Sequence, residues 1–285
     1  MSADLSADLS ADLSPAARCD VVLTGRGLHA GMPSTLRLSR SDGPVVFRTA
    51  RGDARIDELV VLRTDLGVRV RSDAIGLDVD TVEHLLAAFG GLSIRSGVAI
   101  APANEEMPLL DGASLRFAEA LASLEPPREA PRLRVLSSGT VYAGASTYVF
   151  TKDDETSVEV EVTFDASRIG RQTASWDGSA SSFVRDVAWA RTFGFRRDGE
   201  ALLRAGRGRG VDPSTVMVLD DDGAVEAPGA PARSTEFARH KLLDLVGDLY
   251  LFGGPPVGKL HATRPGHGAT RRAMMEALAR RIVGE

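Results

Sequence analysis

The chain has 285 residues, 43% of them hydrophobic, which is enough for one large or two ordinary globular domains with substantial cores. Its formal net charge of −5 at pH 7 argues against a general nucleic-acid-binding protein, because such proteins need a basic face. The single cysteine, Cys19, excludes an internal disulfide and is typical of a reducing compartment. The sequence has no apolar run long enough to cross a bilayer and no signal peptide, so we expect a cytoplasmic protein without a transmembrane segment.

The N-terminal segment differs in composition from the rest of the chain. Residues 2–13 are three copies of Ser-Ala-Asp-Leu, which offer no core, so we expect residues 1–17 to form a disordered leader. The charged, proline-containing stretch 125–131 is typical of a linker. It predicts an N-terminal domain over 18–125 and a C-terminal domain over 132–285.

Short strands alternate with a few helices along both parts. Apolar or alternating runs bounded by glycine, proline and charged residues predict strands at 19–23, 34–38, 44–48, 58–62, 67–71, 98–100, 133–136, 139–143, 147–150, 157–164, 215–219 and 257–262. Periodic apolar positions predict helices at 80–89, 115–124, 198–205, 239–250 and 270–283. We expect Asp80 or Thr81 to cap the first helix, and a turn at 177–182.

The helix predicted at 239–250 has apolar residues around most of its circumference, which predicts that it is buried. Yet His240, Asp244 and Asp248 recur at i, i+4 and i+8, along a single face. One interpretation is an amphipathic helix whose polar stripe faces water. The other is a two-ligand platform for Zn²⁺, since buried charges are costly unless paired or metal-bound. A catalytic zinc site would also need a third protein ligand and an open position.

Three further histidines are candidates for the site. Glu83 and His84 are adjacent on the first predicted helix and point about 100° apart, so one could bind a metal while the other handles a proton. Alternatively, they are a surface acid and a hydrogen-bonded core histidine. His267 lies between two glycines before the last helix, where a ligand-facing imidazole is expected. His29, in the glycine-rich turn 24–31, is either a surface residue or a ligand contact.

Several of these segments together resemble a known family. They are Gly25-Arg-Gly-Leu-His-Ala-Gly31, Thr81-Val-Glu-His-Leu-Leu-Ala-Ala-Phe89, Met107-Pro-Leu-Leu-Asp-Gly-Ala113, Arg191-Thr-Phe-Gly-Phe195, the 239–250 stretch and Gly266-His-Gly268. In this order they resemble the UDP-3-O-acyl-N-acetylglucosamine deacetylases of lipid A biosynthesis. The resemblance extends from about residue 18 to the C-terminus.

The resemblance implies an α+β fold with two similar two-layer domains, each a small sheet packed on helices, and with the helices sandwiched between the sheets. It also implies a βαβ insert at about 186–222 that forms a hydrophobic passage for an acyl chain. The implied reaction is zinc-dependent hydrolysis of the acetamide of UDP-3-O-(3-hydroxyacyl)-N-acetylglucosamine, the committed step of lipid A biosynthesis. We expect a monomer, because no exposed apolar element stands out.

The resemblance also implies roles for individual residues. It implies three ligands of the Zn²⁺ cofactor: His84, His240 and Asp244. It implies four catalytic groups: Glu83 as the general base, His267 as the imidazolium that stabilises the oxyanion and protonates the leaving amine, Asp248 as its orienting carboxylate, and Thr192 as a hydroxyl donor to the oxyanion. It implies five contacts with the UDP-linked substrate: Phe193 and Phe195 as aromatic contacts next to Thr192, Lys241 and His29 near the diphosphate, and Phe164 against the uracil.

The chain departs from the family pattern at three places. Pro265 replaces a small polar residue, Ile94-Arg-Ser-Gly97 replaces a turn with acidic and amide residues, and the loop 206–212 is rich in arginine. Two alternative functions follow: deacetylation of another acylated amino-sugar nucleotide, or a catalytically silent zinc- or ligand-binding paralogue. The presence of a base, an acid and an oxyanion donor argues against the silent paralogue.

Overall fold

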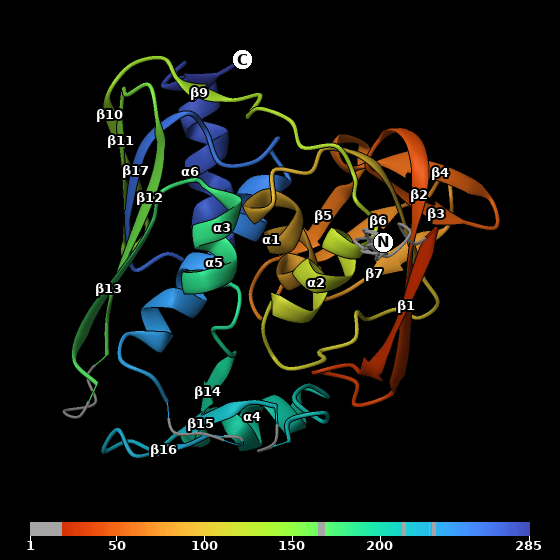
Figure 1. Ribbon diagram of the computed structural model, residues 1–285. Coiled ribbons are helices and arrows are strands. Elements are labelled where there is room, and N and C mark those ends of the chain that lie inside the picture. Colours follow the sequence, from red (N-terminus) through yellow and green to blue (C-terminus); the bar gives the residue numbers. More distant parts are fainter. Residues whose placement is uncertain (1–18, 165–168, 213–214, 228, 230–231) are drawn as a thin grey trace, which may run out of the picture.

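The structure is a computed structural model that describes residues 19–164, 169–212, 215–227, 229 and 232–285. Two five-stranded sheets lie on opposite sides of a group of helices (Figure 1). The Ser-Ala-Asp-Leu repeats, which we predict to be disordered, lie outside the described residues.

The first sheet has the strand order β1-β2-β8-β3-β4. Its strands are β1 (Asp20–Arg26), β2 (Pro33–Pro44), β8 (Ser96–Pro102), β3 (Val46–Thr49) and β4 (Gly52–Arg55). Neighbouring strands are antiparallel except β3 and β8, which are parallel. The sheet therefore consists of two hairpins separated by a strand that comes later in the chain.

The second sheet repeats this arrangement, in the order β10-β11-β17-β12-β13. Its strands are β10 (Gly139–Ala143), β11 (Ser146–Thr151), β17 (Gly258–Thr263), β12 (Thr156–Thr163) and β13 (Arg171–Trp176). Only β12 and β17 are parallel. Strand β13 was not predicted, because this edge strand is mostly polar and only Ala174 and Trp176 are buried.

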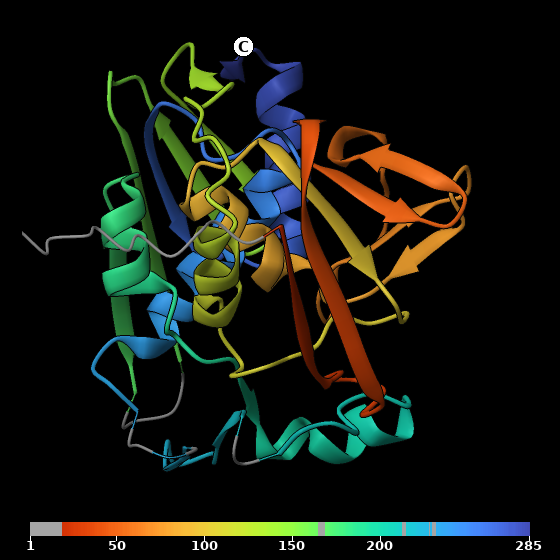
Figure 2. The ribbon, with the colours of Figure 1, turned by 45° about the vertical axis from the view of Figure 1, so that its right-hand side comes forward.

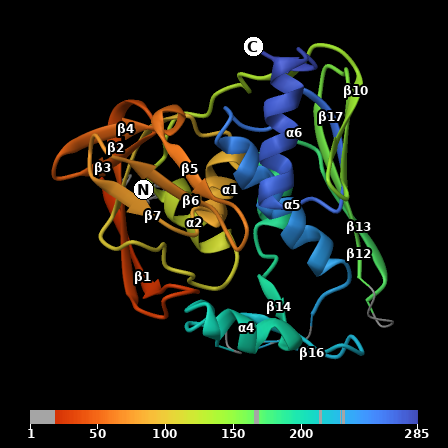
Figure 3. The ribbon, with the colours of Figure 1, turned by 180° about the vertical axis from the view of Figure 1, so that it is seen from behind.

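Three smaller sheets complete the strands. They contain β5 (Val60–Arg63), β6 (Arg69–Ser72) and β7 (Leu77–Val79); β14 (Phe193–Phe195), β15 (Met217–Leu219) and β16 (Val225–Glu226); and β9 (Arg134–Val135) with β18 (Val283–Gly284). Parallel strands β14 and β15 are joined through the 3-10 helix η3 (Arg196–Asp198) and α4 (Gly199–Arg204). This β-α-β unit lies at the lower edge of the molecule in Figures 1 and 3.

The other helices are α1 (Glu83–Gly91), α2 (Leu115–Ser123), α3 (Ala180–Ser182), α5 (Glu236–Tyr250) and α6 (His267–Ala279), with a 3-10 turn η1 (Ile56–Glu58) and a π-helix η2 (Phe183–Val187). The fold is thus a mixture of helices and several small sheets, compatible with the α+β class. None of the described helices combines the length and apolarity needed to span a bilayer.

The helix boundaries differ from the predictions at their N-terminal ends. The prediction that Asp80 or Thr81 caps α1 is wrong: the N-cap is Val82, and Thr81 has a left-handed backbone with φ of 62°. Helix α5 begins at Glu236 and α6 at His267, each three residues earlier than predicted. The predicted turn at 177–182 ends in the short helix α3.

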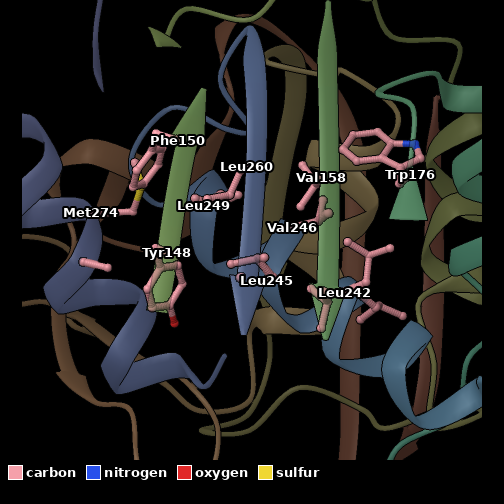
Figure 4. Packing of buried hydrophobic residues seen from close by; sticks show 14 of the residues in the cluster. Tyr148, Phe150, Val158, Trp176, Leu242, Leu245, Val246, Leu249, Leu260 and Met274 are labelled. Carbon is pink, nitrogen blue, oxygen red and sulfur yellow. The ribbon is translucent and has the colours of Figure 1, made fainter. Parts of the chain in front are cut away.

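Two hydrophobic clusters occupy the spaces between the sheets and the helices. One joins the first sheet to α1 and α2. The other joins the second sheet to α5 and α6, where Phe150 lies beside Met274 of α6 and Val158 lies beside Val246 of α5 (Figure 4). Burying one such side chain is worth about 1.5–3 kcal/mol, so the apolar faces of the helices hold the layers together.

Close packing of α1 against α5 joins the two halves at the centre of the molecule (Figure 3). A Cβ atom on Gly247 of α5 would lie 2.2 Å from the backbone oxygen of Glu83 at the start of α1. Only glycine fits at this distance. The polar face of α5 therefore lies directly against the N-terminal turn of α1.

Candidate metal centre and active site

The polar face of α5 is buried. His240, Asp244 and Asp248 are 2%, 5% and 4% exposed, so the interpretation of a stripe facing water is wrong. His84 of α1 meets this face, and one ligand atom from each of His84, His240 and Asp244 lies within 4.8 Å of the others. The Nε2 atoms of His84 and His240 lie 3.7 and 3.5 Å from Oδ1 of Asp244. The three residues can therefore hold a metal ion.

The protonation of this cluster suits a metal. Nδ1 of His240 lies 3.1 Å from the backbone oxygen of Ala190, an arrangement in which Nδ1 carries the proton and Nε2 is free. Burial lowers the pKa of His240, and burial with the nearby His240 lowers the pKa of His84 to about 3. Burial alone would raise the pKa of Asp244, but Lys241 and the histidines lower it. Two neutral imidazoles and one ionised carboxylate fit Zn²⁺.

Glu83 lies beside the cluster in a tight backbone cradle. The N–H of Val68 donates to Oε2 of Glu83 at 2.9 Å. A Cβ atom on Gly67, whose φ is +107°, would lie 2.8 Å from Oε1 of Glu83, so this position needs glycine. Burial raises the pKa of Glu83 to about 7, against the opposing effect of His267. Near neutral pH this carboxyl can therefore both accept and release a proton.

His267 is the first residue of α6 and pairs with Asp248 on the polar face of α5. Its Nδ1 lies 2.8 Å from Oδ1 of Asp248. Burial alone would lower the pKa of His267, but the charge and hydrogen bond of Asp248 raise it to about 10. Burial raises the pKa of Asp248, and His267 opposes that shift. His267 is thus held as an imidazolium, a proton donor close to Glu83.

Thr192 is buried between the segment 107–113 and β15. The backbone N–H of Thr192 donates to the backbone oxygen of Gly112 at 2.6 Å. The backbone oxygen of Thr192 accepts from the N–H of Met217 at 3.0 Å. Its neighbour Arg191 forms a salt bridge of 2.8 Å with Glu236, whose side chain is fully buried. The sequence analysis missed this ion pair, because the two residues are 45 positions apart.

The three predicted substrate-contact aromatics come together in one cluster. The ring of Phe164 lies 5.7 and 6.1 Å from those of Phe193 and Phe195. Phe237, which the sequence analysis did not predict, packs 5.0 Å from Phe193. Phe193 also lies 5.8 Å from the ring of His240, so the aromatic cluster borders the metal cluster. Phe237 lies one helical turn before His240, on the same side of α5, so the sequence spacing could have predicted that it borders the cluster.

The two predicted diphosphate contacts lie at different places. Nζ of Lys241 donates to Oδ2 of Asp244 at 2.8 Å and lies 5.4 Å from the ring of Phe193. Burial alone would lower the pKa of Lys241, but Asp244 raises it, so the ammonium stays charged. Nε2 of His29 lies 2.6 Å from the backbone oxygen of Leu66, in the loop that leads to the cradle of Glu83.

A cavity of about 290 Å³ lies at the other end of α5, beside Tyr250 and Phe252. Its lining includes Arg95, which belongs to one of the departures from the family pattern. The guanidinium of Arg95 donates to backbone oxygens, among them that of Gly253 after the end of α5. None of the predicted site residues, all of which the structure describes, lines this cavity.

Comparisons with known proteins identify the family of the chain. The family model for UDP-3-O-acyl N-acetylglycosamine deacetylase matches residues 16–280. The chain is similar to proteins named UDP-3-O-acyl-N-acetylglucosamine deacetylase from Brucella melitensis biotype 2, Brucella ovis and Brucella abortus. Each is 35% identical over 266 residues, which cover 91% of this chain and 93% of the relative. The chain therefore belongs to the UDP-3-O-acyl N-acetylglycosamine deacetylase family.

Proposed function

We propose that the chain hydrolyses the acetamide of UDP-3-O-(3-hydroxyacyl)-N-acetylglucosamine to acetate and the free amine, the committed step of lipid A biosynthesis. In this proposal Zn²⁺ is bound by His84, His240 and Asp244. The observation that carries it is the convergence of these three ligand atoms within 4.8 Å, with Glu83 and His267 beside them. Family membership supports the acylated UDP-sugar as the substrate.

Glu83 acts as the general base. When bound, Zn²⁺ supplies Lewis acidity, which favours loss of a proton from water and stabilises negative charge on oxygen. The carboxylate of Glu83 takes that proton while the water oxygen forms a bond to the acetamide carbon. A pKa of about 7 suits a base that works near neutral pH, and the hydrogen bond from Val68 fixes its direction.

His267 acts as the general acid. An amine leaves readily only when it is protonated, so the imidazolium gives its proton to the amide nitrogen as the carbon–nitrogen bond breaks. Asp248 keeps His267 charged and oriented until that step. The hydroxyl of Thr192 donates to the carbonyl oxygen as negative charge develops on it. Acetate and the free amine are the products, which balances the water consumed.

The substrate contacts follow from the same arrangement. We propose that Phe193 and Phe195 contact the substrate next to Thr192 and that Phe164 meets the uracil; the packing of the three rings into one cluster supports this. Lys241 and His29 contact the diphosphate in this proposal. The ammonium of Lys241, held charged beside Asp244, is suited to an anionic group.

We also propose that the two halves are separate domains, 18–125 and 132–285, of similar two-layer build with helices between the sheets. The repeated strand order of the two five-stranded sheets supports this. The β-α-β unit within 186–222 is proposed to form the passage for the acyl chain. That the chain acts as a monomer stays a prediction.

The test is acetate release, followed by mass spectrometry, from UDP-3-O-(3-hydroxymyristoyl)-N-acetylglucosamine and from UDP-N-acetylglucosamine without the acyl chain. We expect turnover of the acylated substrate and little of the other. Turnover of only a different acylated amino-sugar nucleotide would overturn the substrate assignment and leave the hydrolytic mechanism intact.

A further inference from the structure

The arginine-rich loop 206–212, after α4, packs against the glycine-rich turn 24–31 between β1 and β2. The N–H of Arg209 donates to the backbone oxygen of His29 at 3.0 Å, and the N–H of Gly210 donates to that of Leu28 at 3.0 Å. A Cβ atom on Gly210 would lie 2.0 Å from the backbone oxygen of Gly27. Figures 1 and 2 show α4 beneath the ends of β1 and β2. The two segments, about 180 residues apart, are therefore in direct backbone contact.

Arg207 is buried where this loop and this turn meet. It is 8% exposed, its Nη2 donates to the backbone oxygen of Leu66 at 2.7 Å, and its Nη1 lies 3.7 Å from Oδ2 of Asp80. Nε2 of His29 lies 2.6 Å from the same oxygen of Leu66. Burying a guanidinium costs free energy unless the charge is paired and hydrogen-bonded, so a buried arginine at this position indicates a specific role. Both ends of its fork bind protein groups, which argues against a direct role in substrate binding.

The two groups that Arg207 contacts each adjoin a segment next to Glu83. Leu66 immediately precedes Gly67 and Val68, whose backbone encloses the Glu83 carboxylate. Asp80 lies three residues before Glu83, at the entry to α1. A guanidinium has donors in fixed directions and can hold two such groups in one geometry, whereas an ammonium is a single point charge.

We propose that Arg207 is a positioning residue for the reaction: by holding the Leu66 carbonyl close to Asp80, it fixes the backbone that orients Glu83. The inference rests on the proposed function, in which Glu83 is the general base. It assigns a role to the arginine-rich loop, one of the departures from the family pattern. The loop thereby connects the β-α-β unit to the catalytic base.

Steady-state kinetics of Arg207→Met test this proposal, with Arg204→Met as the matched control, since the side chain of Arg204 on α4 is 78% exposed. We expect Arg207→Met to lower kcat by about 10- to 100-fold, the effect of misplacing a catalytic group by about 1 Å, with KM and bound zinc unchanged. Arg204→Met should match the wild type. If Arg207→Met does not fold, Arg207→Lys should fold and still show the reduced kcat.

A double variant separates positioning from a general structural role. In a Glu83→Gln background, Arg207→Met should cause no further loss of kcat, because it acts only through the base. An unchanged kcat in both Arg207 variants, a raised KM with intact kcat, or a further loss in the Glu83→Gln background would each overturn the proposal. If Glu83→Gln alone leaves kcat unchanged, the proposed function fails instead.

Discussion

Nδ1 of His267 lies 2.8 Å from Oδ1 of Asp248, and this pair joins the first residue of α6 to the polar face of α5. Asp248 is buried and the side chain of His267 is only 12% exposed, so the imidazolium and the carboxylate depend on each other for charge compensation. The charge of His267 also acts on the pKa of Glu83 and of Asp244. One ion pair thus connects the proposed acid, the proposed base and a proposed metal ligand.

Replacing Asp248 by Asn should lower kcat by about 100-fold or more, within the range that general acid catalysis contributes. Without the carboxylate the pKa of His267 falls from about 10 toward or below its ordinary value of about 6.5, so the acid is lost at lower pH. The pH–rate profile should show its alkaline limb shifted down by more than one pH unit. The control is Glu159→Gln beside His261, an exposed pair at 3.2 Å, which should leave the profile unchanged.

Replacing Glu83 by Gln should reduce kcat by about 10²- to 10⁴-fold, because the general base is lost. Gln keeps the shape and can still accept the Val68 hydrogen bond, so the metal cluster should remain intact. Bound zinc, measured by atomic absorption, should equal that of the wild type. Undiminished turnover in this variant would show that another group removes the proton. It would contradict the proposal that Glu83 is the general base and that the Val68 hydrogen bond orients it.

Replacing Gly247 by Ala should push α1 away from α5, because the new Cβ would lie 2.2 Å from the backbone oxygen of Glu83. Overpacking of this kind costs about 1–3 kcal/mol of unfolding free energy. Zinc affinity should fall as well, since His84 comes from α1 and the other two ligands from α5. Gly199→Ala in α4, where nothing lies within 4 Å, is the control and should change neither property. Unchanged zinc affinity in Gly247→Ala would contradict the dependence of the site on this helix contact.

Replacing Glu236 by Gln should lower the unfolding free energy at pH 7 by about 1.5–3 kcal/mol, because the fully buried side chain of Glu236 loses its charged hydrogen bonds with Arg191. Burial alone would raise the pKa of Glu236, but Arg191 and the backbone hydrogen bonds lower it. Its stabilisation is therefore present above the ordinary pKa of about 4.3 and is lost as pH falls through the folded value.

Urea unfolding between pH 3 and 7 measures this effect. The wild type should lose stability on acidification more steeply than Glu236→Gln. The surface pair of Arg280 and Glu276 provides the control, since Glu276→Gln should change stability by less than about 1 kcal/mol. Parallel pH curves for the wild type and Glu236→Gln would mean that the buried pair does not contribute in this way.

The helix α5 and its polar face could be predicted because a helical repeat fixes which side chains share a face. The i, i+4 and i+8 spacing placed His240, Asp244 and Asp248 on one face, and the structure confirms this. The divergence of Glu83 and His84 on α1 could be predicted for the same reason. Burial of the polar face of α5 could not be derived from the spacing alone. A stripe facing water and a buried metal platform therefore both remained possible.

Contacts between distant segments could not be predicted, because sequence patterns carry no information on which loops meet. Arg207 and Leu66 are 141 positions apart, and the loop of Arg207 gave only a composition rich in glycine and arginine. The start of α1 was misjudged for a different reason. Asp80 and Thr81 are good capping residues, but Asp80 pairs through its backbone with residues 105–107, which holds it outside the helix.

The most direct test of the account is acetate release from UDP-3-O-(3-hydroxymyristoyl)-N-acetylglucosamine by metal-stripped and zinc-restored protein, compared in one experiment. The account predicts that turnover disappears on stripping, returns with one equivalent of zinc, and fails to return in His240→Ala. Turnover that survives complete removal of the metal, or zinc that binds without restoring turnover, would contradict it.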